Sequence, residues 1–436
     1  MPNLKNRPSM LRRRSTKPLT VVIAPSGFKE SLSAEEAAEH IASGVMRALP
    51  QARVLKAPMA DGGEGFTRAL VHATGGTLHP CRVTGPVGDP VDAFFGFLGG
   101  RAQRTAVIEM AAAAGLRLVP RDRRNPMLTT SFGVGELIRA ALDAGAQRVL
   151  LGCGDSGIND GGAGMVQALG ARLLDEKGGE LGAGGGELQR LHHIDLRGLD
   201  ARLARVTLDA AVNWHNVLLG ERGVARVFGP QKGATPAQVD MLDAALTRYA
   251  ACIVQATGRD MGQAPGGGAS GGLGAGFAAL LGGTLHPRFD IVMQYLELDG
   301  LIAQADLVIT AEGSLDHQTP YGKVPAEVAQ RAKRRGLPVI ALAGTIGTGV
   351  EINFEHGIDA FASILSRPCT LDEAIAQAGP LLRRAAEDAL RMVSVGLGLG
   401  AAWGSRRGEA AAARGPLPMP GRRQPQAMLT AAPLPT

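Results

Sequence analysis

The first folded stretch of the sequence reads PLTVVIAPSGF (residues 18–28) and is followed by SLSAEEAAEHIASGVMRAL (residues 31–49). The apolar, β-branched run in the first segment is typical of a buried parallel strand, which a proline and a glycine then end. The second segment has the spacing of a helix, in which Ser33 is a suitable N-cap and Glu36 completes a capping box. The chain therefore opens with a strand, a loop and a helix, the unit from which α/β folds are built.

The same alternation returns near the other end of the chain. The segments ADLVITAEGS (305–314) and LPVIALAGTIG (337–347) have the pattern of strands, and VPAEVAQRAKRRG (324–336) has that of a helix. Repeated alternation of this kind predicts a parallel sheet with helices on both faces. The middle differs, because CRVTGPVGDPVDAFFGFLG (81–99) and RTAVIEMAA (104–112) look like strands joined by turns.

This change of pattern predicts an α/β protein of two domains, one inserted in the other. Residues 19–78 and 286–397 are expected to form a Rossmann-like parallel-sheet domain, and residues 79–285 an inserted α/β domain with a mixed sheet. A ligand is expected in the cleft between them. Residues 1–18 and 398–436 are predicted to be disordered tails, the first basic and the second rich in Pro, Ala and Arg.

The positive charge of the chain is concentrated in these tails. The sequence has 46 basic and 40 acidic side chains, a formal net charge of +6. The first 18 residues contribute +6 and residues 401–436 contribute +4, so the stretch between them carries a net charge of −4. A nucleic-acid-binding surface needs basic charge gathered on a folded face. The sequence therefore predicts a small-molecule substrate and no nucleic-acid partner.

Cysteine usage and hydropathy favour the cytoplasm. Cys81, Cys153, Cys252 and Cys369 are widely spaced and form no CxxC pair, which is typical of a reducing compartment. No apolar run reaches the roughly 18 residues of a membrane span, so no membrane partner is expected. The Arg-rich start resembles an organelle transit peptide, but an initiator at Met10 is the simpler explanation. The oligomeric state is left open between a monomer and a homodimer.

Glycine is unusually frequent, at 61 of 436 residues, about twice the usual level of roughly 7%. The densest segments are DGGEG (61–65), CGDSGINDGGAG (153–164) and PGGGASGGLGAG (265–276). They follow predicted strands or precede helices, where the ligand sites of doubly wound sheets form. Their backbone amides are suited to cradle phosphate groups. A helix start is the plainer explanation of the first segment, and a flexible hinge that of the third.

Charged side chains accompany these glycines. Lys29 lies where the first strand gives way to a helix, and Lys232 precedes another helix. Both are placed to meet an anion, although either would also suit a solvated turn. Asp155 and Asp160, in the second glycine segment, are placed to take a proton from a substrate hydroxyl.

Two pairs of carboxylates are candidate ligands of a metal ion or of substrate hydroxyls. Asp61 and Glu64 enclose two glycines, and Glu312 and Asp316 follow a predicted parallel strand, with Lys323 at the next helix start. Magnesium usually takes one or two carboxylates together with phosphate oxygens. An N-capping role is the alternative for the first pair. The histidines form no metal-binding set, and no Ser-His-Asp arrangement is visible.

The combination of carboxylates, single lysines and glycine loops favours phosphoryl transfer. This reaction needs cations at the phosphates and a carboxylate at the attacking hydroxyl, and little covalent chemistry from the protein. The nucleotide-binding device is not a P-loop, because no Lys-Ser or Lys-Thr pair follows the glycines of segment 265–276.

The motifs resemble those of the bacterial glycerate kinase family over roughly residues 19–397. The resemblance rests on IAPSGFKESL, ADGGEG, AVIEMAAAAGL, RNPMLTTSFGVGELI, NDGGAGMVQALGARLLD, RGVARVFGPQKGAT, GGGASGGLGAG, VITAEGSLDHQT and PVIALAGTIG, in this order. It implies ATP-dependent phosphorylation of D-glycerate with Mg²⁺, at the 2-hydroxyl to give 2-phosphoglycerate. It also implies that the parallel-sheet domain is flavodoxin-like and carries the second α/β domain as an insertion.

Three segments depart from the family's pattern. The chain has APSGFK (24–29) where APDSFK is frequent, so one carboxylate is missing, and NWHNVL (213–218) where DVDNPL is frequent. It has CGDSGINDGG (153–162) where GGSATVDGG is frequent, which makes Asp155 a new carboxylate. These changes bear on the substrate more than on the reaction. The alternatives are therefore a kinase of another short hydroxy or sugar acid and, less favoured by the retained acids and lysines, a non-catalytic sensor of a sugar acid or nucleotide.

The resemblance and the residue chemistry together suggest a division of roles. Asp160 is expected nearest the accepting hydroxyl, and Lys29 and Lys232 at the substrate carboxylate or the transferred phosphate. Glu312 and Asp316 are expected to hold Mg²⁺. The predicted substrate-binding residues are Ser26, Asp61, Glu64, Asp155, Asn213 and Asn216, and those predicted to bind ATP are Gly266, Gly267, Gly268, Ser270, Gly271, Gly272 and Lys323.

Overall fold

The computed structural model describes residues 18–28, 31–59, 62–100 and 102–412. The chain divides into two compact units, and Thr16–Asp388 is the larger one. The last helix, α14 (Ala378–Ala412), runs across the boundary between the units and continues past the predicted beginning of the C-terminal tail at residue 398. The rest of that tail and nearly all of the predicted N-terminal tail lie outside the described residues.

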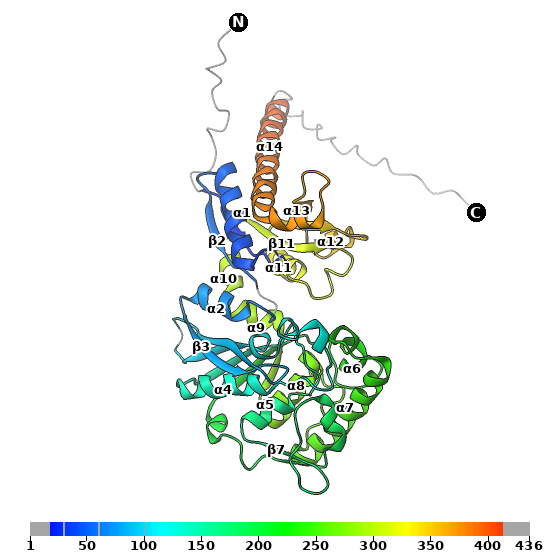
Figure 1. Ribbon diagram of the computed structural model, residues 1–436. Helices are drawn as coiled ribbons and strands as arrows, with labels where there is room; N and C mark the ends of the chain where they lie inside the picture. Colours follow the sequence, from blue (N-terminus) through cyan, green and yellow to red (C-terminus); the bar gives the residue numbers. More distant parts are fainter. Residues whose placement is uncertain (1–17, 29–30, 60–61, 101, 413–436) are drawn as a thin grey trace, which may run out of the picture. The chain divides into compact units, whose positions relative to one another are not determined.

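A five-stranded parallel sheet is formed by the two ends of the larger unit. Its strands are β1 (Thr20–Ile23), β2 (Arg53–Lys56), β11 (Leu307–Leu315), β12 (Val339–Ile346) and β13 (Ala360–Ser363), in the order β13-β12-β11-β1-β2. Figure 1 shows β2, in blue, close to β11, in yellow-green, although more than 200 residues separate them in the sequence. This is the flavodoxin-like order, whose switch point lies between β1 and its neighbour β11. The predicted parallel sheet is confirmed.

A second, mixed sheet is built from residues between β2 and β11. Its order is β10-β9-β6-β5-β4-β3, in which β5, β6, β9 and β10 are parallel and β3 and β4 run antiparallel to their neighbours. The expected meander is thus confined to one edge. The bounds are β3 (Thr77–Thr84), β4 (Pro90–Phe97), β5 (Thr105–Glu109), β6 (Arg148–Gly152), β9 (Thr207–Val212) and β10 (Thr284–Pro287), and the short β7 (Arg172–Leu174) and β8 (His193–Asp195) pair separately. The domain limits at 79 and 285 stay a prediction.

Helices connect the parallel strands, as expected of an α/β fold. The capping box predicted at the first of them is present, because the Glu36 amide donates to the Ser33 hydroxyl and the Ser33 amide to the Glu36 carboxylate. The α-helices are α1 (Ala34–Ala48), α2 (Phe66–Thr74), α3 (Ala111–Ala114), α4 (Phe132–Asp143), α5 (Ala163–Ala168), α6 (Val224–Phe228), α7 (Pro236–Thr257), α8 (Ala269–Leu280), α9 (Arg288–Tyr295), α10 (Leu298–Ile302), α11 (Val324–Lys333), α12 (Ile352–Glu355) and α13 (Leu371–Ala376). Short 3₁₀ helices span Leu116–Leu118, Arg121–Arg123, Gly185–Arg190, Ala201–Arg205 and Pro230–Lys232.

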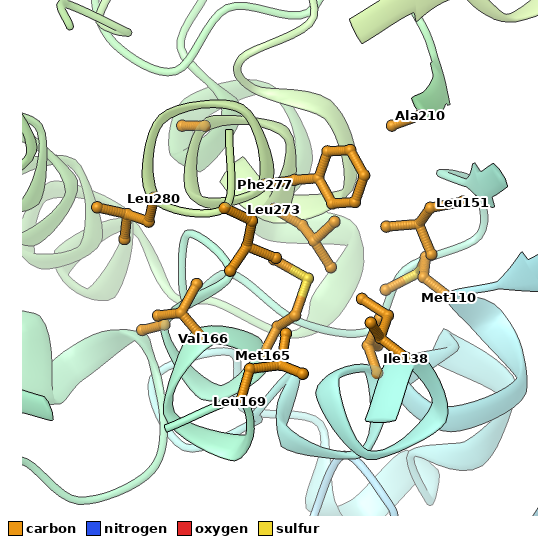
Figure 2. Close-up of a cluster of buried hydrophobic side chains, with 14 of the residues drawn as sticks. Met110, Ile138, Leu151, Met165, Val166, Leu169, Ala210, Leu273, Phe277 and Leu280 are labelled. Carbon is orange, nitrogen blue, oxygen red and sulfur yellow. The ribbon is translucent and has the colours of Figure 1, made fainter. Parts of the chain in front are cut away.

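Small aliphatic side chains and methionines build most of the core, in line with the low aromatic content of the sequence. On one face of the mixed sheet, Leu151 and Met110 pack with Met165 of α5 and Phe277 of α8 (Figure 2). The other face of this sheet contributes to a second cluster, which also contains Val22 of β1 and Val308 of β11 together with apolar side chains of α2 and α9. Burial at roughly 25 cal/mol per Å² makes these clusters the main source of stability.

The glycines of segment 265–276 allow backbones to touch. A Cβ at Gly268 would collide with the carbonyl oxygen of Val217, and a Cβ at Gly271 with that of Ile158. Gly271 also has a φ of +72°, in the region that disfavours other L-residues. The glycine density thus brings α8 against the two loops that follow β6 and β9.

This packing predicts a large cost for Gly271→Ala. Gly282 is a matched control, because its φ is also positive (+74°) but a Cβ there would meet nothing within 4 Å. Gly282→Ala should lower the free energy of unfolding by about 1 kcal/mol for its backbone conformation, and Gly271→Ala by about 1–3 kcal/mol more because of the collision. Urea unfolding of both variants measures the difference. Equal losses would mean that the loop moves away without cost.

Candidate active site

The first candidate group lies at the carboxyl ends of β1 and β11, the switch point of the parallel sheet. Ser26 follows β1, and its amide donates to the carbonyl of Ala311 at 2.8 Å, while its hydroxyl donates to the same oxygen at 3.2 Å. The next residue along β11 is Glu312. The structure therefore brings Ser26 and Glu312, predicted from segments far apart in the sequence, to neighbouring strand ends.

Three of the predicted residues form one charged cluster there. Lys323 Nζ lies 3.2 Å from Asp316 Oδ1 and 3.5 Å from Glu312 Oε1, and it donates to the carbonyl of Ser314 at 3.1 Å. The Thr319 hydroxyl donates to Glu312 Oε1 at 3.1 Å. Two carboxylates and one ammonium group thus face one another at the end of β11.

The two carboxylates of this cluster differ in their protonation. Burial raises the pKa of Glu312 to about 7, although Lys323 and Thr319 act to lower it. Asp316 also suffers some burial, but the amide of Gln318 and the Lys323 ammonium outweigh it and lower its pKa. At neutral pH, Asp316 is ionised and Glu312 is poised between its two forms.

The second candidate group lies at the carboxyl ends of β5, β6 and β9 in the mixed sheet. The amide of Glu64 donates to Asp155 Oδ2 at 3.0 Å, and the Glu64 carboxylate lies 3.2 Å from Arg117 Nε. Asp155 is exposed and has a φ of +50°, a conformation that non-glycine residues adopt at a cost and that clusters at functional sites. The structure thus brings together the predicted Glu64 and Asp155 and adds Arg117, which no sequence motif singled out.

A buried glutamate that sequence reasoning missed lies beneath this group. Glu109 ends β5, is 4% exposed, and accepts a hydrogen bond from the amide of Thr67 at 2.9 Å. Burial raises its pKa to about 7, against the amides of Thr67 and Gly65 and the guanidinium of Arg68. A signal was present in the sequence, because Glu109 comes directly after an apolar run of residues, as Glu312 does.

Asp160 has a different environment from the one expected of a catalytic base. It is 1% exposed, and its carboxylate accepts hydrogen bonds from the amide and hydroxyl of Ser131 at 2.7 and 2.8 Å and from the amides of Gly162 and Gly164 at 3.1 and 3.2 Å. Burial raises its pKa in spite of these donors. The carboxylate therefore joins the starts of α4 and α5, and a substrate hydroxyl has no access to it in this structure.

Lys232 is also buried, at 2% exposure, instead of facing an anionic ligand. Its Nζ donates to Ser156 Oγ at 3.0 Å, to the carbonyl of Ile158 at 2.6 Å and to Asn159 Oδ1 at 3.0 Å. Burial lowers its pKa to about 7, while Asp160 acts to raise it. Because an ammonium group has three hydrogens, these bonds leave none for a phosphate, and Lys232 fixes the loop after β6.

The segment predicted to cradle ATP phosphates is occupied by the protein itself. The amides of Gly266 and Gly268 donate to the carbonyls of Trp214 and Asn216 at 3.1 Å, and that of Gly267 to Ala264 at 2.9 Å. Gly271 and Gly272 are buried against the loop after β6, and Ser270, with a φ of +52°, is buried as well. The prediction of an open cradle at these glycines is therefore not supported, because their backbone contacts hold loops together.

The remaining predicted residues complete this description. Asn213 and Asn216 are half-buried in the loop after β9, where Asn213 Oδ1 accepts from the amide of His215 at 3.2 Å. Lys29 and Asp61 lie outside the described residues. Within the described ranges no group of three or more His, Cys, Asp or Glu side chains could hold a metal ion, and no helix there is long and apolar enough to cross a membrane.

Comparisons with known proteins agree with this architecture. The model of the glycerate kinase family matches residues 21–394. The chain is 49% identical to a glycerate kinase of Bacillus subtilis, over 85% of this chain and 96% of the relative, and 46% identical to a glycerate 2-kinase of Escherichia coli, over 87% and 99%. A crystal structure described as a "putative glycerate kinase 2" from Salmonella typhimurium LT2 has a TM-score of 0.78 and 46% identity, covering 87% of this chain and all of that one.

The buried position of Asp160 predicts that Asp160→Asn loses stability first. An amide group cannot accept from all four donors, and it removes the charge nearest Lys232, so the free energy of unfolding should fall by about 3 kcal/mol. Asp155→Asn is the control, since an exposed carboxylate with one hydrogen bond should cost at most about 1 kcal/mol. Urea unfolding tests both. A normally stable Asp160→Asn protein with a kcat reduced by orders of magnitude would restore Asp160 as the base.

Proposed function

This chain belongs to the glycerate kinase family, and we propose that it transfers the terminal phosphoryl group of ATP to the 2-hydroxyl of D-glycerate, giving ADP and 2-phosphoglycerate. The observation that carries the proposal is the presence of two charged groups at strand ends, one in each sheet. One, Glu312 with Asp316 and Lys323, suits a metal–nucleotide complex. The other, Glu64 with Asp155 and Arg117, suits a small hydroxy acid. The name of the Escherichia coli relative supports the 2-position.

The donor set at the end of β11 fits a magnesium ion that is also bound by phosphates. Mg²⁺ prefers carboxylate oxygens and commonly uses one or two of them beside phosphate oxygens and water. Glu312 and Asp316 offer such oxygens around one Lys323 ammonium group. When bound, Mg²⁺ would neutralise charge on the transferred phosphoryl group. Lys323, whose ammonium group already contacts Ser314, Asp316 and Glu312, would balance the negative charge of the phosphates at this site.

We assign Asp155, an exposed carboxylate, as the group that accepts the proton of the substrate 2-hydroxyl. The oxygen of the 2-hydroxyl attacks the γ-phosphorus, the bond from that phosphorus to the ADP oxygen breaks, and the hydroxyl proton passes to Asp155. Asp155 Oδ2 is held by the amide of Glu64, and no described residue donates to its Oδ1. Arg117, paired with Glu64 at the surface, is placed to meet the substrate carboxylate, a role that the fully bonded Lys232 does not fill.

The other features of the chain suit a metabolic enzyme of the cytoplasm. All four cysteines are free thiols, as expected in a reducing compartment. We therefore propose glycerate and ATP as its partners, with no nucleic acid and no membrane. The oligomeric state stays open between a monomer and a homodimer.

A second substrate is favoured by the loop after β9. Trp214 is 39% exposed and His215 is exposed beside Asn213, in a segment that differs from the common family pattern. An aromatic and an imidazole ring at this place would suit a longer hydroxy or sugar acid. The reaction would be unchanged.

Purified full-length protein with ATP, Mg²⁺ and a panel of three- and four-carbon hydroxy acids tests the function. We expect ADP formation with D-glycerate and a phosphate at C2, read by phosphorus and proton NMR. Asp155→Asn should lower kcat by about 10²–10⁴-fold, the usual contribution of a general base. Asp240→Asn, on α7 in an exposed ion pair with Arg226 of α6, is the matched control and should keep wild-type kcat. No ADP with any acid would refute the proposed activity.

The raised pKa of Glu312 predicts a pH-dependent requirement for magnesium. Below about pH 7 this carboxyl group is protonated, and a protonated carboxyl is a poor metal ligand. The Mg²⁺ concentration for half-maximal activity should therefore rise as the pH falls from 8 to 6. Glu312→Gln should need more Mg²⁺ throughout and lose most of this pH dependence. An unchanged requirement in the variant would exclude Glu312 as a ligand.

A further inference from the structure

The start of α2 is held by a carboxylate from another part of the sheet. Its N-cap residue is Gly65, which has no side chain to accept a hydrogen bond from the first turn. Glu109, at the end of β5, supplies that acceptor, because its Oε2 accepts a hydrogen bond from the amide of Thr67 at 2.9 Å. The amide of Gly65 also acts to lower the pKa of this carboxyl group. A carboxylate at a helix N-terminus typically contributes as much as an N-cap side chain does.

The segment that precedes α2 is held against the mixed sheet at two more points. Glu109 is the register partner of Gly152 at the end of β6, and a Cβ on Gly152 would come within 2.8 Å of the Gly62 carbonyl oxygen. On its outer side, the amide of Glu64 donates to Asp155 Oδ2 at 3.0 Å. Segment 62–65 therefore lies between a buried carboxylate, Glu109, and an exposed one, Asp155.

Glu109 does not take part in the chemistry proposed above, and it is 4% exposed. The charged groups that act on it are Glu64 on the same segment and Arg68 one turn into α2, with opposite effects on its pKa. Thr67 donates its backbone amide to Glu109, but its side-chain hydroxyl is buried and has no hydrogen-bond partner among the described residues. Burying a carboxyl group here costs desolvation free energy, so an apolar residue at the end of β5 would give the more stable fold.

We propose that Glu109 is a positioning residue, whose ionised carboxylate fixes segment 62–65 and thereby the contact of Glu64 with Asp155 that orients the phosphoryl acceptor. This inference rests on the proposed function for the identity of the acceptor. The placement of the segment itself does not. Glu109 acts on the substrate through Glu64 and Asp155 and touches no reacting atom.

The sign of the pH effect follows from the raised pKa of this group. Glu109 is protonated below about pH 7 and ionised above it. A neutral carboxyl accepts weaker hydrogen bonds from amides than a carboxylate does. As the pH falls from 8 to 6, segment 62–65 should loosen and the KM for glycerate should rise about fivefold, the equivalent of a lost N-cap hydrogen bond. The kcat should change less, because the reacting groups are unaltered.

The test compares full-length wild type, Glu109→Gln and Glu136→Gln. Glu136 of α4 is a matched control, because its carboxylate also accepts a hydrogen bond from a backbone amide, that of Thr84. This contact lies away from both candidate groups. Glu109→Gln should raise the KM about fivefold at pH 8 and abolish its rise toward pH 6. Glu136→Gln should keep the wild-type KM profile. A wild-type KM profile in Glu109→Gln would overturn the proposal.

Hydrogen–deuterium exchange of peptides covering residues 62–70 provides a readout that does not depend on the reaction. After correction for intrinsic exchange rates, wild type should exchange faster at pH 6 than at pH 8 in this segment, and Glu109→Gln should exchange fast at both. If Glu109→Gln does not fold, the wild-type comparison decides. Equal protection at the two pH values would refute the positioning role, whereas absent kinase activity with pH-dependent protection would refute only the proposed function.

Discussion

The candidate active site depends on contacts between backbones that only glycine permits. Segment 62–65 packs on the loop after β6, and that loop packs on segment 266–272. At Gly152, Gly268 and Gly271 an added Cβ would collide with a carbonyl oxygen of the neighbouring segment. Backbones this close share hydrogen bonds, such as that of the Gly161 amide to the Gly271 carbonyl. The strand ends and their charged side chains are therefore held in fixed relation without a large aromatic core.

Buried charge reinforces the same arrangement. Asp160 gathers four donors from the starts of α4 and α5, and Lys232 ties the loop after β6 from the other side. Burial costs both groups much of their solvation free energy. Hydrogen bonds to the protein and the attraction between the two groups offset this cost. Their hydrogen bonds join loops and helix starts, whereas Asp155 is exposed and Lys323 is partly exposed. Charged residues of the same chemical type in the glycine loops therefore differ widely in burial.

The sequence predicted more of the fold than of the site. Apolar runs with helical segments between them gave the parallel sheet, and the capping box at Ser33 and Glu36 was found where expected. The cluster of Glu312, Asp316 and Lys323 was also anticipated as a group, because all three residues lie on or shortly after one strand. Asp160 and Lys232 were expected to face a substrate, but both are buried. A linear sequence pattern does not distinguish a buried carboxylate with four hydrogen-bond donors from an exposed one. Glu109 was overlooked for the converse reason, because it reads as the end of a strand.

What the sequence by itself determined is the type and order of the elements, the place of the glycine segments and the resemblance to a kinase family that the comparisons confirm. These follow from local periodicity and short motifs, which need no knowledge of distant contacts. Only the tertiary structure decided which charged groups are buried and which meet one another. Glu109 and Thr67 are 42 residues apart, and Glu64 and Asp155 are 91 apart. Protonation and access depend on such contacts, because burial and hydrogen bonding set the free energy of a charge.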